Sequence, residues 1–274
     1  MQSTSAWKEV LAKPKAGAHI LQTYREESFL VEAVSYFVGE GLVRGEAVIL
    51  IATPEHESLF VERLTKMGLD VKKAIQRHQL YIMDAKGTLA AFMRDGLPSW
   101  DLFERVIGNW VREAQLRYPS VRAYGEMMNI LWQDGERAAA GSVESYWNKL
   151  SQRQNFSLLC AYAIDPLNAE FYDGSLQSIC KCHTHFIPYE NYAGIEEAVG
   201  AVGQRILGAS LASMVKRLSM PNHMSTEMPP TQATLFFLSE HMPLSIKNIF
   251  SKVQQHYDSH CKRNKNKSAP DLAG

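Results

Sequence analysis

The stretch AHILQTYREESFLVEAVSYFVGEGLVRGEAVILIAT, residues 18–53, predicts a strand, a helix and a second strand in succession. Residues 47–53 are apolar and rich in β-branched side chains, as in a strand buried on both faces. Between the strands, apolar residues from Phe29 to Val38 recur at three- and four-residue spacing, the period of an amphipathic helix. We expect Gly39 and Gly41 to end that helix. This order favours parallel pairing through a right-handed crossover.

The same alternation continues along the chain. Further strands are predicted at 79–85, 121–128, 156–162 and 185–188, and further helices at 55–68, 102–118, 138–152 and 170–183. The predicted fold class is therefore α/β, with a mainly parallel sheet flanked by helices. Ligands of such sheets bind beyond the carboxyl ends of the strands. The residues at those ends are Tyr24, Thr53, Asp84, Glu126 to Met128 and Tyr162.

Composition and charge exclude several classes of protein. Lys+Arg and Asp+Glu both number 29, so the formal net charge is zero, whereas nucleic-acid coating and anionic membrane surfaces need a positive field. Four cysteines in 274 residues do not make a disulfide framework. The first residues are too polar for a signal peptide, and the apolar runs are too short to span a bilayer. We expect a cytoplasmic protein with neither a membrane nor a nucleic-acid partner.

The turn after the first strand does not have the composition of a phosphate loop. It reads TYREESF, residues 23–29, contains no glycine or lysine, and carries Glu26 and Glu27. A phosphate cradle needs glycines so that backbone N–H groups converge, and a lysine to neutralise charge. The sequence also has no nucleophile elbow, zincin or dinucleotide motif. We expect no cofactor.

Glu126 lies near the end of a predicted central strand, where a carboxylate is partly buried and needs a partner or a proton. It can contact a ligand or act as a general base, or it can be an internal cap or salt-bridge partner, and both interpretations stay open. Met127 and Trp132 would form an apolar wall nearby, although such residues also commonly belong to the core. A lone histidine such as His19, at the start of the first strand, is more typical of structural hydrogen bonding.

Seven stretches occur together in one order: AHILQTY, GLVRGEAVILIATPEH, MDAKGTLAAFMRDGLPSWDLF, VRAYGEMMNILWQDG, VESYWNKL, FSLLCAY and SICKCHTHFIP. With this combination, residues 17–192 resemble the MEDS family, the methanogen/methylotroph sensory domain of the DcmR type. The resemblance implies a fold similar to the RecA/KaiC ATPase core without a functional phosphate loop, which agrees with the turn at residues 23–29. It also implies a bacterial sensory domain that responds to small organic molecules such as hydrocarbon derivatives.

The resemblance identifies candidate ligand-binding residues, which are His19, Tyr24, Asp84, Glu126, Met127, Trp132 and Cys160. Further family-like positions are Gly125, Glu144, Trp147, Asn148, Cys180, His183 and His185. The sequence departs from the pattern at Leu21, where family members often have a cysteine. Any ligand role of that thiol is therefore lost here.

The stretch CKCHTH, residues 180–185, raises the question of a metal site, because thiolates and imidazoles are the ligands that zinc prefers. No second pair elsewhere in the sequence has matching spacing, and Cys182 lies outside the family-like pattern I-C-x-x-H-x-H-x-x-P. We interpret the stretch as a helix-to-strand junction in which His183 complements the helix dipole. A metal site made of Cys180, His183 and His185 is the alternative hypothesis.

The chain is predicted to divide into six segments. These are an N-terminal extension (1–16), the MEDS-like sensory domain (17–192), a connecting helix (193–219), a linker (220–230), a helical hairpin (231–260) and a disordered basic tail (261–274). The residues after 192 are too few for a kinase catalytic domain and contain no nucleotide-binding glycine box. This part of the chain is predicted as a helical extension of the α/β domain.

We therefore expect a non-enzymatic sensor that binds a small, apolar organic molecule at the C-terminal edge of the sheet. The C-terminal helices would relay binding to a protein partner, such as a histidine kinase or regulator, or to a second copy of the chain. One alternative is a residual ATPase-like enzyme with Glu126 as its base, but without a phosphate cradle it would lack most of what phosphoryl transfer requires. Another is a transcriptional regulator that acts through residues 231–260.

Overall fold

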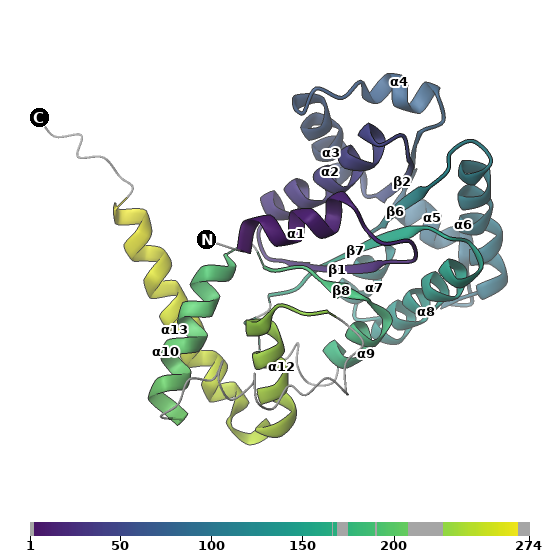
Figure 1. Ribbon diagram of the computed structural model, residues 1–274. Coiled ribbons are helices and arrows are strands. Elements are labelled where there is room, and N and C mark those ends of the chain that lie inside the picture. Colours follow the sequence, from purple (N-terminus) through teal and green to yellow (C-terminus); the bar gives the residue numbers. More distant parts are fainter. Residues whose placement is uncertain (1–2, 166, 169–174, 190, 208–226, 268–274) are drawn as a thin grey trace, which may run out of the picture.

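The computed structural model contains a six-stranded sheet in which every strand pairs in parallel (Figure 1). It describes residues 3–165, 167–168, 175–189, 191–207 and 227–267. The strands are β1 His19–Tyr24, β2 Ala47–Ala52, β3 Leu80–Asp84, β6 Val121–Gly125, β7 Ser157–Ala163 and β8 His185–Phe186. Their order across the sheet is β3-β2-β6-β7-β1-β8. The predicted parallel α/β class is confirmed.

Helices cover both faces of the sheet, because successive side chains of a strand point to opposite faces. Val48 and Leu50 of β2 belong to one core, and Ile49 and Ile51 belong to the other. The first core is covered by α1 Ser3–Ala12, α2 Glu27–Val43, α3 Pro54–Lys66 and α4 Val71–Gln76. The second is covered by α5 Ala85–Phe92, α6 Trp100–Gln115, α7 Met127–Gln133, α8 Arg137–Arg153 and α9 Ser175–Cys182. A small hairpin, β4 Met93–Arg94 and β5 Leu97–Pro98, connects α5 to α6.

A buried arginine joins α1 to the sheet. Arg122 of β6 is fully buried, and its guanidinium pairs with both carboxylate oxygens of Glu46. Its remaining N–H groups donate to the carbonyls of Leu11 at 2.7 Å, Phe37 at 3.0 Å and Ala12 at 2.9 Å. Two of these carbonyls lie at the C-terminal end of α1, where a helix leaves carbonyls without partners of its own. The guanidinium therefore caps α1 and attaches it to the central strand.

Helix α2 runs past the two glycines that we expected to end it. It reaches Val43, and the chain then turns at Gly45, which has a φ of 74°. Gly41 instead makes room for the buried arginine, because a Cβ at this position would lie 2.8 Å from Arg122 Cδ. The expectation that Gly39 and Gly41 end the helix is wrong. Close packing, and not helix termination, requires a glycine at position 41.

The C-terminal helices share the core of the α/β domain. They are α10 Tyr192–Leu207, α12 Pro230–His241 and α13 Pro243–Lys267, and α10 lies beside α13 (Figure 1). Leu235 and Phe250 from these helices belong to the same buried cluster as Trp147 of α8. The predicted hairpin ended at residue 260, before a disordered tail, but α13 continues to Lys267 because its sequence has no glycine or further proline to stop it. Residues 208–226 and 268–274 lie outside the described residues.

Several short elements were not predicted, because a helix of few turns shows little periodicity. They are α1, α4, α5, α7 and the β4–β5 hairpin. The strand predicted at 121–128 ends at Gly125, so Glu126 precedes α7 instead of lying within a strand. Among the described helices, none combines the length and apolar character needed to cross a bilayer. The likeness to the RecA/KaiC core stays a prediction.

Candidate functional site

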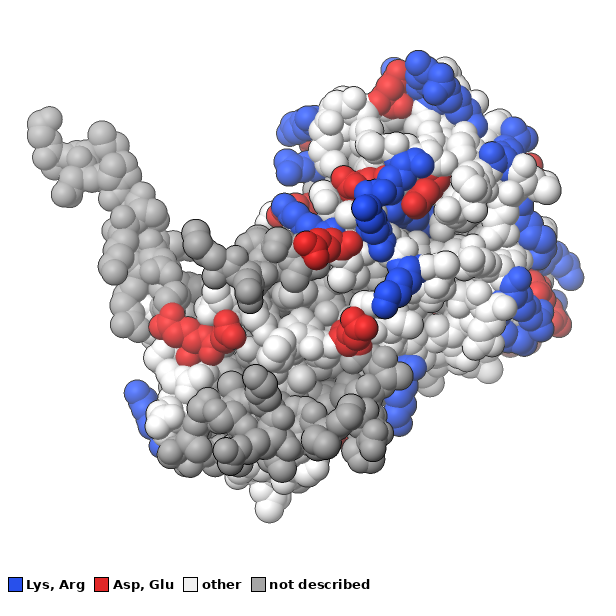
Figure 2. All heavy atoms as spheres, in the orientation of Figure 1, with Lys and Arg blue, Asp and Glu red and all other residues white. Residues whose placement is uncertain are grey.

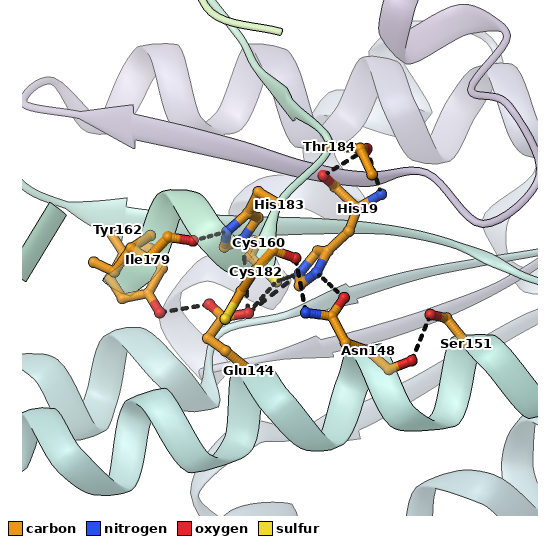
Figure 3. Close-up of polar contacts among 10 residues, drawn as sticks. All are labelled: His19, Glu144, Asn148, Ser151, Cys160, Tyr162, Ile179, Cys182, His183 and Thr184. Atoms are coloured by element: carbon orange, nitrogen blue, oxygen red, sulfur yellow. Dashed lines mark hydrogen bonds and ion pairs between the residues drawn. The ribbon is translucent and has the colours of Figure 1, made fainter. Parts of the chain in front are cut away.

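Four side chains of metal-binding type meet on the face of the sheet that α8 and α9 cover (Figure 3). His19 begins β1, Glu144 lies in α8, Cys160 lies in β7, and His183 directly follows α9. All four are buried, with exposures of 3%, 1%, 0% and 2%. One potential ligand atom from each residue lies within 4.8 Å of the others. We call these four residues the buried His/Glu/Cys group.

Local structure positions each member of this group. Glu144 follows Val143 and precedes Trp147 on the buried side of α8. Cys160 points to the same face of β7 as Tyr162, because residues two apart in a strand share a face. The residue after His183 joins the junction to β1, since Thr184 N–H donates to the His19 carbonyl at 2.7 Å. The helix-to-strand junction predicted at residues 180–185 is thus also one wall of the group.

The distances within the buried His/Glu/Cys group are short. His19 Nε2 lies 3.1 Å from Cys160 Sγ and 3.2 Å from Glu144 Oε2. His183 Nε2 lies 3.6 Å from the same oxygen of Glu144, and the centroids of the two imidazole rings are 4.0 Å apart. One oxygen of Glu144 therefore faces both histidines.

The atoms of these residues that face away from the centre have their own partners. His19 Nδ1 lies 2.9 Å from Asn148 Oδ1, and His183 Nδ1 lies 2.7 Å from the Ile179 carbonyl (Figure 3). The Tyr162 hydroxyl donates to Glu144 Oε1 at 2.5 Å. Each of these hydrogen bonds restricts how the ring or carboxylate can turn.

Burial and mutual contact set the ionisation of the group. Burial alone would raise the pKa of Glu144, but the two imidazoles and the Tyr162 hydroxyl hold that pKa at about 2, so the carboxylate is charged. Burial, followed by His19, lowers the pKa of His183 to about 4, so this imidazole is neutral near pH 7. Burial and the charge of Glu144 raise the pKa of the Cys160 thiol.

A second polar group lies at the carboxyl ends of β1, β2 and β6. Glu126 Oε2 accepts from the Thr53 N–H at 2.9 Å. Glu126 Oε1 accepts from the Tyr124 hydroxyl at 2.9 Å and contacts His56 Nδ1 at 2.7 Å. The hydrogen bond to Glu126 raises the pKa of His56 against the opposing effect of its burial. Burial, then the charges of Glu126 and Glu27, raise the pKa of Tyr24.

Of the predicted ligand-binding residues, Tyr24 and Glu126 lie close enough to interact, whereas His19 and Cys160 belong to the separate buried His/Glu/Cys group. Asp84 caps α5, where its carboxylate accepts from the Gly87 N–H at 2.6 Å. Met127 is fully buried in the core. Trp132 packs edge-on against the Tyr162 ring, with centroids 5.7 Å apart.

The metal ligands considered for residues 180–185 do not come together in the structure. Only His183 joins the buried His/Glu/Cys group among the described residues. Burial raises the pKa of the Cys180 thiol to about 12, and His185 faces Glu227, with Nε2 3.5 Å from its carboxylate. The clustering depends on strand order, which places His19 and Cys160 beside the junction.

Sequence reasoning named Glu144 only as a family-like position, and it did not select Glu144 or His56 as a ligand-binding residue. Glu144 could have been noticed as a carboxylate on the apolar side of an amphipathic helix, between Val143 and Trp147. His56 stands just after a predicted strand end, at the start of α3, but nothing in the sequence links it to Glu126.

A pocket of about 560 Å³ opens at the lateral edge of the sheet, beside β8. Its walls come from α1, residues 185–188, the start of α10 and residues 227–230. The apolar part of the lining includes Trp7, Val10, Phe186, Ile187, Tyr192 and Met228, and the polar part is His185, Glu196 and Glu227. None of the seven predicted ligand-binding residues lines this pocket.

The chain combines a parallel α/β domain, two buried polar groups and a helical C-terminal extension, and its class follows from comparison with protein families. Residues 18–184 match the MEDS model, described as the MEthanogen/methylotroph, DcmR Sensory domain. The match covers more than half of the 274 residues. The chain therefore belongs to the MEDS family of sensory domains. No curated protein matches it.

Proposed function

We propose that this protein is a non-enzymatic sensor that binds a small, largely apolar organic molecule in the pocket beside β8. The observation that carries the proposal is the position of this pocket between the sensory domain and the C-terminal helices. Its volume of about 560 Å³ suits a small molecule, because ligand pockets commonly measure roughly 300–1,000 Å³. Its aromatic and aliphatic lining would contact the body of the ligand.

The few polar groups of the pocket would orient the ligand. His185 and Glu227 contact each other at its rim, and burial lowers the pKa of His185. A neutral imidazole beside a carboxylate can donate to or accept from an alcohol, an ether or a carbonyl group. This chemistry fits a hydrocarbon derivative that carries one polar function.

The pocket also offers a route for the relay. Phe186 N–H donates to the Glu227 carbonyl at 2.8 Å, and Glu227 N–H donates to the Thr184 carbonyl at 2.9 Å. The segment that leads into α12 is therefore held on the edge strand that lines the pocket. If these walls have two arrangements and the ligand binds one of them more tightly, binding would shift the population toward that arrangement. The accompanying change in the position of α12 and α13 is what a protein partner would recognise.

The group around Glu126 gives further support to a role without catalysis. Both of its oxygens already receive hydrogen bonds, from Thr53 and from Tyr124 with His56. A general base needs a lone pair directed at a substrate. Figure 2 also shows positive and negative side chains intermixed on the described part of this face, unlike the continuous basic surface of a nucleic-acid-binding protein.

Thermal unfolding with a panel of small organic molecules tests the proposal. We expect an increase in melting temperature with an apolar or halogenated compound, and none with Mg·ATP. Ala193→Trp places a large ring in the pocket and should abolish the increase, whereas Ala138→Trp, at an exposed position of α8 outside the lining, should keep it. Stabilisation by Mg·ATP that is lost in Glu126→Gln would instead support the enzymatic alternative.

Hydrogen exchange tests the relay separately. We expect the stabilising compound to change exchange in α12 and α13 as well as at residues 185–188. A ligand that slows exchange only at the pocket residues would contradict the proposed relay to α12 and α13, although it would still show binding.

A further inference from the structure

We propose that the buried His/Glu/Cys group binds one divalent metal ion of the zinc type, with His19 Nε2, His183 Nε2, Cys160 Sγ and Glu144 Oε2 as ligands. These four residues lie apart from the pocket lining, so the inference goes beyond the proposed function and does not depend on it. It also differs from a site made of Cys180, His183 and His185. The argument rests on distances, tautomers and charge.

The separations of the ligand atoms fit tetrahedral coordination. Zinc lies about 2.0–2.3 Å from nitrogen, oxygen and sulfur ligands, so two ligands of one tetrahedral ion lie about 3.3–3.8 Å apart. Four of the six separations between these ligand atoms are 3.1, 3.2, 3.6 and 3.8 Å. These four separations are within a few tenths of an ångström of the tetrahedral range, and the remaining two are no longer than 4.8 Å, so small side-chain shifts would complete the coordination shell.

Hydrogen bonds fix the tautomers of both histidines. Asn148 Nδ2 donates to the Cys182 carbonyl at 2.8 Å, so Asn148 Oδ1 is the atom that faces His19 and it must accept. The Ile179 carbonyl can also only accept, from His183 Nδ1. Each Nδ1 therefore carries a proton, and in the neutral ring the lone pair of Nε2 points into the group. Histidine ligands of metals commonly have such outer partners.

The carboxylate is held in the same way. Tyr162 donates to Glu144 Oε1, which leaves Oε2 directed at both imidazoles. Two nitrogen lone pairs and a carboxylate oxygen thus converge with a sulfur atom in a buried space, an arrangement that favours a cation at its centre. A Zn²⁺ ion with one thiolate, one carboxylate and two neutral imidazoles has no net charge, which avoids the cost of a buried charge.

Four protein ligands and full burial indicate a structural ion, because catalytic zinc sites keep a position for water or substrate. The ion would link β1, β7, α8 and the junction after α9. Thr184, next to the ligand His183, bonds to β1 on one side and to Glu227 on the other. Metal binding would therefore fix the edge strand that lines the pocket.

Metal analysis of the full-length protein, purified without chelators and with any affinity tag removed, tests the site. We expect about one zinc ion per chain, lost in Cys160→Ser and in His183→Gln. Cys180→Ser is the matched control, because Cys180 is equally buried nearby but is outside the group, and it should retain the ion. Full metal content in both ligand variants would overturn the proposal.

A titration of metal-free wild-type protein with Co²⁺ keeps the test independent of variant folding. Tetrahedral Co²⁺ with a thiolate ligand gives intense visible bands and a sulfur-to-metal charge-transfer band. We expect both to saturate at one equivalent, and the charge-transfer band to be lost in Cys160→Ser while Cys180→Ser keeps it. Absence of uptake of Co²⁺ and Zn²⁺ by the wild type would show that the group is only a hydrogen-bonded core.

Discussion

Tyr162 illustrates how much a single hydroxyl can matter at the residue scale. It donates from near the carboxyl end of β7 to a carboxylate that is itself 1% exposed. A buried carboxylate that loses a donor keeps the full cost of its missing solvation. The orientation of Glu144 and the stability of the fold therefore depend on the same hydrogen bond.

We expect Tyr162→Phe to lower the free energy of unfolding by about 1–3 kcal/mol and to weaken metal binding roughly 10- to 100-fold. Tyr81→Phe is a matched control, because the buried Tyr81 hydroxyl has no hydrogen-bond partner among the described residues. Chemical unfolding and a competitive metal titration measure the two effects. Equal losses of stability in the two variants would contradict the role given to Tyr162.

His56 should make stability depend on pH. Its hydrogen bond to Glu126 raises the pKa of the folded form above the ordinary 6.5, so the stabilisation is complete below that value and is lost as the pH rises through the raised pKa. We expect the difference in unfolding free energy between wild type and His56→Gln to shrink as the pH rises above about 6.5. His78→Asn, at an exposed turn, should show no such trend in the same urea titrations.

The sequence allowed His19, Cys160 and His183 to be named as candidates, but not to be grouped. Their clustering requires β1 to lie between β7 and β8, and no local pattern encodes strand order. Glu126 was predicted near a strand end and does lie there, yet its partner His56 arrives from α3 through the tertiary fold. Residue types were therefore predictable, and their partners were not.

At the element scale, Arg122 attaches α1 to the sheet. The guanidinium makes five hydrogen bonds, in which it donates to Glu46 and to three backbone carbonyls. Lysine offers three donors from a single atom and cannot reproduce this fork. The N-terminal segment, predicted as an extension, places Trp7 and Leu11 in the core beneath this contact.

We expect Arg122→Lys to cost about 2–4 kcal/mol of unfolding free energy, because at least two buried acceptors lose their donors. Limited proteolysis should then cleave the variant between residues 1 and 18 faster than the wild type. Arg105→Lys, at an exposed position of α6, should leave both measurements unchanged. An intact N-terminus in Arg122→Lys would show that apolar packing alone holds α1.

The larger elements were predictable because their periodicities are strong. The run at residues 47–53 became β2, and the apolar spacing from Phe29 to Val38 became α2. The end of α2 was not predictable from the sequence. Gly41 makes room for the side chain of a residue that lies 81 positions away in β6, and it does not end the helix. Long-range packing of this kind produces no pattern in the local sequence.

At the scale of the whole molecule, the α/β domain and the C-terminal helices share one apolar core. Phe250 and Val253 of α13 lie in the same cluster as Phe103 and Trp147. A shared core makes the two parts cooperate in unfolding. The extension is thus energetically part of the sensory domain to which it is attached.

We expect Phe250→Ala to lower the unfolding free energy by about 3–5 kcal/mol and to keep a single transition in calorimetry. Leu244→Ala is the control in the same helix, because Leu244 is 100% exposed, and it should have almost no effect. Two separate transitions, with only the smaller one shifted by Phe250→Ala, would show that the helices unfold on their own.

The place of β1 in the sheet also has a consequence for synthesis on the ribosome. β1 pairs with β7 and with β8, which are made more than 130 residues later, whereas β2 can pair with β3 almost at once. The first strand to emerge is therefore among the last to find its neighbours, and parallel pairing over such distances is slow. During translation its apolar residues remain available to chaperones and to misplaced strands.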